Sequence, residues 1–76
     1  MITLSQAFKL CKIRDDELVY LRRSNVSFAT LRGLDIYTGK YIREKMDMKK
    51  IWVVSIRPFF SFGEYEGMEF EVVLEK

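Results

Sequence analysis

The feature that most constrains the fold is a regular alternation of apolar and polar residues in the last third of the chain. Every even position from 52 to 62 is apolar, and from 68 to 75 the even positions are apolar while three of the four odd ones are glutamate. Successive side chains of a β-strand point to opposite faces, so this period predicts two strands with one buried face. The residues expected on that face are Trp52, Val54, Ile56, Pro58, Phe60, Phe62, Met68, Phe70, Val72 and Leu74.

A short glycine-bounded stretch separates the two predicted strands. The stretch from Gly63 to Gly67 has five residues, a length that is typical of a β-hairpin loop. If the loop closes directly, strands near 51–61 and 68–75 pair antiparallel, with Phe60 opposite Phe70. That register puts the even residues of both strands on one face, so the turn and the pattern favour the same pairing.

The first residues carry the start signal of a helix. Thr3 and Gln6 have the spacing of a capping box, in which each side chain binds a backbone N–H of the other residue. Apolar residues then recur at helical spacing. They predict a helix over 4–12 whose buried side holds Leu4, Ala7, Phe8 and Cys11.

The middle of the chain is less regular. Residues 18–21 are branched or aromatic and predict a short strand. Residues 24–34 contain turn residues and a glycine, so they form either an irregular loop or a short helix over 27–32. A second helix is expected over 39–47.

The second helix also has a recognisable start. Thr38 is a suitable N-cap, and Tyr37 and Ile42 stand at the two positions of a hydrophobic staple around it. The resulting order is α-β-(loop or short α)-α-β-β. We expect a single small α+β domain over residues 1–76, with two helices packed on one face of a small antiparallel sheet and a C-terminal β-hairpin. A winged-helix arrangement has the same order if 27–32 are helical.

The composition argues against an enzyme. The chain has no histidine and one cysteine, so imidazole chemistry is excluded, and Cys11 on the apolar stripe is expected to be a buried structural thiol. Glu69, Glu71 and Glu75 share a predicted strand face with Arg57, which indicates a cross-strand charge ladder rather than a metal site. We therefore predict no catalytic residue, no metal and no cofactor.

The compartment follows from similar observations. A lone cysteine cannot form an intramolecular disulfide, and the N-terminal segment lacks the continuous apolar run of a signal peptide. No window approaches the roughly 20 apolar residues that a membrane span needs. We expect a cytoplasmic protein without a membrane partner, of a size and composition that would suit a phage or mobile-element product.

Protein contact is the favoured function. Tyr65 lies between Glu64 and Glu66 in the predicted loop, where a tyrosine offers a large contact area at small entropic cost. Phe59 and Val73 are expected on the outer, odd face of the hairpin. These five residues predict a non-enzymatic interaction module that contacts another protein, or a second copy as a homodimer. In the alternative, the apolar residues of the odd face are covered by another segment and Tyr65 folds over the strand ends.

DNA binding is the second hypothesis, because charge is unevenly distributed. Residues 1–58 hold twelve Lys/Arg against six acids, a net of +6, whereas residues 59–76 hold five glutamates and one lysine, a net of −4. In a winged-helix arrangement the helix over 39–47 would enter the groove. The expected nucleic-acid contacts are then Arg22, Arg23, Lys40, Tyr41, Arg43, Lys49 and Lys50. The glutamates of the hairpin loop weigh against this, since they would face phosphates.

Overall fold

The computed structural model describes residues 1–24 and 34–74, which form two helices and five strands. Their bounds are β1 Ile2–Thr3, α1 Leu4–Cys11, β2 Leu18–Arg23, β3 Leu34–Thr38, α2 Gly39–Lys45, β4 Ile51–Ser61 and β5 Glu64–Leu74. The α+β class predicted from the sequence is confirmed. The alternatives for residues 27–32, and the position of Glu75, lie outside the described residues. Within the described ranges, neither helix is long and apolar enough to cross a membrane.

The five strands form one mixed sheet in the order β1-β4-β5-β2-β3. Every neighbouring pair is antiparallel except β2 and β5, which are parallel. The prediction of an antiparallel sheet is therefore wrong. A parallel pair needs a long crossover connection, and the chain between β2 and β5 provides one that includes β3, α2 and β4. The winged-helix arrangement is not confirmed, because strand β3 occupies the residues directly before α2.

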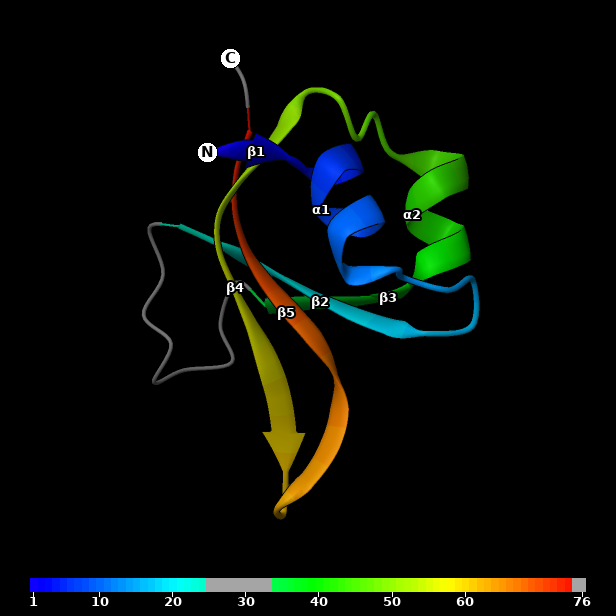
Figure 1. Ribbon diagram of the computed structural model, residues 1–76, viewed down its shortest axis with the longest axis vertical. Helices are drawn as coiled ribbons and strands as arrows, with labels where there is room; N and C mark the ends of the chain where they lie inside the picture. The colour runs from blue at the N-terminus through cyan, green and yellow to red at the C-terminus, as the bar shows by residue number, and fades with distance from the viewer. Residues whose placement is uncertain (25–33, 75–76) are drawn as a thin grey trace.

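Both helices cover the same face of the sheet, toward the end where the N-terminal strand lies (Figure 1). The predicted capping box starts α1: the Thr3 hydroxyl accepts from the Gln6 N–H at 3.2 Å, and Gln6 Oε1 accepts from the Thr3 N–H at 2.8 Å. One core cluster joins the helices to the sheet. Its buried members are Leu4, Ala7, Phe8, Ile13, Val19, Leu21, Ile42, Ile51, Val53, Phe70 and Val72.

The start of α2 is also as predicted, and its end comes two residues earlier. The Thr38 hydroxyl accepts from the Tyr41 N–H at 3.1 Å, and the helix ends at Lys45. The Tyr37 ring lies on the Tyr41 ring, with centroids 5.0 Å apart and planes nearly parallel. Ile42 is fully buried in the core.

The hairpin has a tighter turn than the sequence predicts. Ser61 pairs with Glu64, so the loop is two residues, Phe62 and Gly63, and both have positive φ angles of 52° and 81°. This combination is that of a type I′ turn, whose twist matches that of the flanking strands. The five-residue loop was therefore a wrong prediction.

The predicted register fails with the loop. Phe60 lies opposite Tyr65 rather than Phe70, and Phe70 lies opposite Ile56. Gly67 belongs to strand β5, where its role is close approach: a Cβ placed there would stand 2.3 Å from the Leu18 carbonyl oxygen.

A bulge explains why the even positions of β4 do not all face the core. Val53 pairs with Val72 and Ser55 with Glu71, so Val54 is an extra residue without a cross-strand partner. Odd residues such as Ile51 and Val53 are buried before the bulge, and even residues share the face of Phe70 after it. The predicted even face is confirmed for Phe70 and Val72. It is wrong for the exposed residues Val54, Ile56, Pro58, Phe60 and Phe62, and Trp52 is only half-buried.

Candidate functional site

The turn end of the β4–β5 hairpin extends beyond both helices (Figure 1). We call this end the hairpin tip and define it by Phe60, Phe62, Glu64, Tyr65 and Glu66. Its aromatic side chains remain largely in solvent, with 57% of Phe60, 104% of Phe62 and 52% of Tyr65 exposed. The two glutamates are exposed as well. The tip is therefore an apolar surface bordered by negative charge.

Phe62 stands in an unusual backbone conformation. Its φ of 52° places it in the left-handed region, which costs a residue with a Cβ roughly 1–2 kcal/mol. Type I′ turns favour asparagine or aspartate at this position, because their short polar side chains tolerate the conformation. Phe62 thus combines a disfavoured backbone conformation with a fully exposed ring, and neither the turn nor the core requires a phenylalanine side chain at this position.

Tyr65 connects the tip to the rest of the molecule. Its hydroxyl donates to Glu17 Oε2 at 3.4 Å, and its ring meets the Phe60 ring edge-on at a centroid distance of 6.0 Å. Partial burial of the hydroxyl, followed by the nearby Glu17 carboxylate, raises the pKa of Tyr65 above 10.0. The tip is held against the segment before β2 by this contact, while much of the Tyr65 ring stays exposed.

The structure separates the five residues that the sequence assigned to protein contact. Glu64, Tyr65 and Glu66 lie at the tip, but Phe59 is on the opposite face of the hairpin, stacked on Tyr20 at 4.1 Å. Val73 lies near the base of the hairpin, paired with Trp52. Sequence reasoning missed Phe62, which it assigned to the buried face. The sequence signal that could have identified Phe62 as a turn residue is the glycine directly after it, since Asn-Gly pairs are typical of two-residue turns.

The residues assigned to nucleic acid differ in exposure and in their partners. Arg22 is 1% exposed, and its Nε lies 3.4 Å from Glu69 Oε2. Arg43 binds the Asp15 carboxylate and the Ile13 carbonyl. Tyr41 stacks on another tyrosine, as described above. Tyr41 and Arg43 are nevertheless exposed, as are Arg23, Lys40, Lys49 and Lys50.

A buried ion pair lies on the sheet face that the helices leave free. Glu69 is 1% exposed and accepts from the Nε atoms of both Arg22 and Arg57. Arg57 is also its cross-strand partner in the hairpin, so the predicted charge ladder is present. On the same face, the Ser55 hydroxyl donates to Glu71 at 3.1 Å. These contacts account for the carboxylates as structural groups.

No group of three or more potential ligands among residues 1–24 and 34–74 could hold a metal ion. Cys11 is half-buried against the core rather than fully buried, and its thiol is free. Burial first, and the Glu17 carboxylate second, raise the pKa of this thiol above 9.0. The raised pKa disfavours the thiolate, which is the reactive form.

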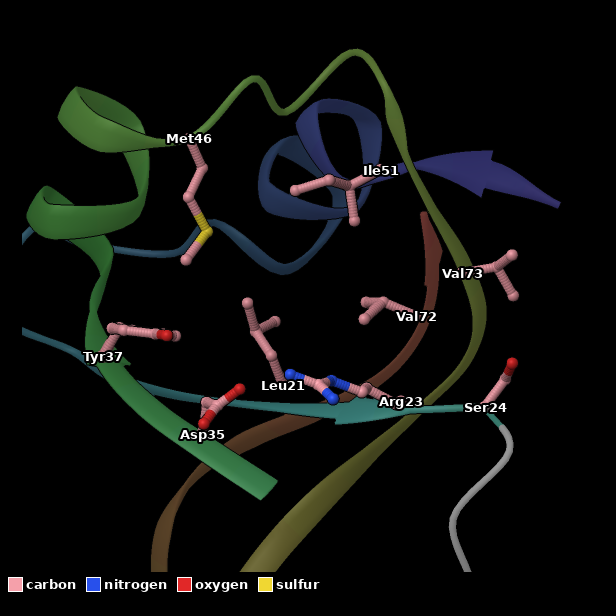
Figure 2. A pocket seen from close by; sticks show the side chains of 9 residues that line it. All are labelled: Leu21, Arg23, Ser24, Asp35, Tyr37, Met46, Ile51, Val72 and Val73. Carbon is pink, nitrogen blue, oxygen red and sulfur yellow. The ribbon is translucent and has the colours of Figure 1, made fainter. Parts of the chain in front are cut away.

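A concave feature lies at the base of the hairpin, on the helix side of the sheet. This base pocket encloses about 320 Å³. Its lining residues are Leu21, Arg23, Ser24, Asp35, Tyr37, Met46, Ile51, Val72 and Val73. Figure 2 shows apolar side chains from the sheet and from the end of α2 around it, with the charged ends of Arg23 and Asp35 turned toward each other.

The polar groups of the base pocket act on one another. Burial first, then Asp35 and Tyr41, raise the pKa of Tyr37, and the nearby Arg23 opposes the increase. The pocket is therefore an apolar hollow with one cation and one anion beside a tyrosine ring.

The comparisons with known proteins add no assignment to either feature. No protein-family model matches the chain, and neither a curated protein nor a solved structure is significantly similar to it.

Proposed function

We propose that this protein is a non-enzymatic protein-interaction module and that the hairpin tip is its contact surface. The partner is a protein with an apolar cleft bordered by lysine or arginine. The observation that carries the proposal is Phe62, an apolar ring that is 104% exposed on a backbone with a φ of 52°. The type I′ turn requires a positive φ at this position but does not require a phenylalanine there, and a strained residue that asparagine could replace is a reason to look for a role in binding.

The neighbours of Phe62 support the same interpretation. Phe60 and Tyr65 lie opposite each other in the hairpin and are both more than half exposed. Exposed apolar groups that cluster within a polar border are typical of protein contact sites, and aromatic anchors supply most of the binding free energy there. Glu64 and Glu66 at the border favour a partner with positive charge.

Phe62→Asn separates binding from folding. Asparagine tolerates the left-handed conformation, so the free energy of unfolding should stay the same or rise by about 1 kcal/mol. Loss of the anchor should weaken partner binding by at least about 2 kcal/mol, or about 30-fold in Kd. Urea unfolding measures the first quantity, and isothermal titration with the purified partner measures the second.

The partner can be identified through the same position. A photo-crosslinking phenylalanine analogue at position 62 should form an adduct, whereas the analogue at Val54 should not. Val54 is a matched control because it is 47% exposed and lies near the hairpin base in β4, the strand that leads into the turn. Val54→Thr should leave the affinity unchanged. Equal affinity of Phe62→Asn and the unchanged chain would overturn the proposal.

A further inference from the structure

The base pocket has the properties expected of the partner's binding site, which are an apolar cleft and a basic residue at its border. Among residues 1–24 and 34–74 it is open to solvent, its floor is formed by the apolar side chains of Leu21, Ile51 and Val72, and Arg23 stands at its edge. A volume of about 320 Å³ is at the lower limit of small-molecule sites, which range from roughly 300 to 1,000 Å³. The size suits one anchoring side chain better than a large cofactor.

From these properties we infer that the hairpin tip of one copy inserts Phe62 into the base pocket of a second copy. This inference rests on the proposed function, and it names the chain itself as the partner. The ring of Phe62 would lie on the apolar floor between Tyr37 and Met46, and Glu64 would reach Arg23 at the edge.

Charge favours this contact over a symmetric contact between two tips. Two tips brought together would place four exposed glutamates in one interface, and like charges within an interface are strongly unfavourable. The pocket, in contrast, has the cation Arg23 as well as the anion Asp35 in its lining, and the exposed charged residues that adjoin its lining residues in sequence are mainly basic: Lys45, Lys49 and Lys50 against Asp47. The acidic tip therefore meets a more complementary border at the base pocket than at another tip.

The distance between the hairpin tip and the base pocket shows whether the contact forms within one chain or between two copies. The pocket is lined by residues at the start of β4 and the end of β5, whereas Phe62 is in the turn at the other end of these 11-residue strands. At about 3.3 Å per residue, the two features lie about 30 Å apart along the hairpin. A chain cannot insert its own tip into its own pocket. The contact joins different surfaces of two copies, so it is head-to-tail and each added copy presents a new free tip.

Two single variants test the contact from its two sides. Phe62→Asn removes the anchor and leaves the pocket unchanged. Arg23→Glu, at an exposed residue, places a negative charge beside the inserted Glu64 and leaves the tip unchanged. In sedimentation velocity, the average mass of the unchanged chain should rise with concentration without a limit at the dimer. Each variant alone should sediment at the 9.1 kDa of a single chain at concentrations where the unchanged chain associates.

Mixing the two variants gives the decisive result. The Arg23→Glu chain still has a tip, and the Phe62→Asn chain still has a pocket, so one intact contact can form. An equimolar mixture should produce a dimer of twice the single-chain mass and nothing larger, because both remaining contact surfaces are defective. A mixture of Phe62→Asn with the double variant Phe62→Asn/Arg23→Glu should stay monomeric.

The outcomes distinguish this inference from the proposed function. An unchanged chain that is monomeric at all concentrations, or a variant mixture that forms no dimer while the unchanged chain associates, overturns the head-to-tail contact. If position 62 then crosslinks to a different protein, the hairpin tip remains a contact surface. If position 62 crosslinks to nothing and Phe62→Asn changes neither mass nor affinity, the proposed function fails as well.

Discussion

The base and the tip of the β4–β5 hairpin both have apolar side chains on the face toward the helices. These side chains are buried at the base and exposed at the tip. At the base, Val53 and Val72 form a cross-strand pair that is buried under the helices. At the tip, Phe60 and Tyr65 form the equivalent pair, and both are more than half exposed. An apolar face is thus buried only where another layer lies on it. Regular alternation in the sequence predicts which side chains share a face of the strand, but it does not predict whether a helix covers that face.

The largest expected effect comes from comparing Phe70 with Phe60. Phe70 is fully buried, with its ring centroid 6.0 Å from that of Phe8. Phe70→Ala should lower the free energy of unfolding by about 3–5 kcal/mol, which is close to the whole stability of a small domain. Phe60→Ala should cost less than about 1 kcal/mol, because the residue already lies mostly in solvent. Urea unfolding followed by Trp52 fluorescence measures both, and equal losses would show that the tip is packed like the base.

The next largest expected difference in stability is between variants of a buried and an exposed carboxylate of β5. Glu69 is buried between two arginines, so Glu69→Gln removes the charge that balances Arg22 and should cost about 3 kcal/mol. The matched variant Glu64→Gln lies at the exposed tip and should change stability by less than about 0.5 kcal/mol. Chemical denaturation of the two variants under one buffer condition tests the pair. A small loss for Glu69→Gln would contradict the structural role of the buried ion pair.

The smallest effect concerns the contact that fastens the tip to the body. The pKa of Tyr65 is raised above 10.0 by burial and by Glu17, so the unfolded chain releases this proton at lower pH than the folded chain. The stabilising contribution is therefore complete below pH 10 and is lost as the pH rises through the folded-state value. Tyr65→Phe should reduce the alkaline loss of stability.

Glu17→Gln provides the control for this prediction. It should lower the Tyr65 titration midpoint measured by NMR of labelled tyrosine, while leaving that of Tyr20, whose pKa is raised by burial and by Glu66, unchanged. An unchanged Tyr65 midpoint in Glu17→Gln would show that the carboxylate does not act on the hydroxyl.

Much of the local structure could be predicted from the sequence, because its causes are local. The capping box at Thr3, the N-cap at Thr38 and the extended character of β2 depend on residues within a few positions of one another. The parallel pairing of β2 with β5 could not be predicted, since period 2 is the same for a strand with parallel or antiparallel neighbours. The register failed because the two-residue turn, the irregularity between Phe59 and Phe60 and the bulge at Val54 each shift the pairing.

The candidate site was predicted in part for the same reason. The acidic residues and Tyr65 were identified from their position between two glycines. Phe62 was missed, because an even apolar residue in an alternating strand is expected to be buried. Its exposure depends on where the helices end relative to the hairpin, and the base pocket depends on the packing of α2 over β2 and β3. Neither arrangement has a signal in a single stretch of sequence.

The central position of β5 has a consequence for how the chain folds during synthesis. It follows every other described strand in the chain, yet the pairs β1–β4 and β2–β3 are joined only through it. Before β5 leaves the ribosome, the nascent chain can form two separate half-sheets, each with an open edge where β5 will insert. Arg22 meets Glu69 across 47 residues of chain only at that step. Assembly of the complete sheet is therefore a late event, and open strand edges expose the nascent chain to mispairing until β5 closes them.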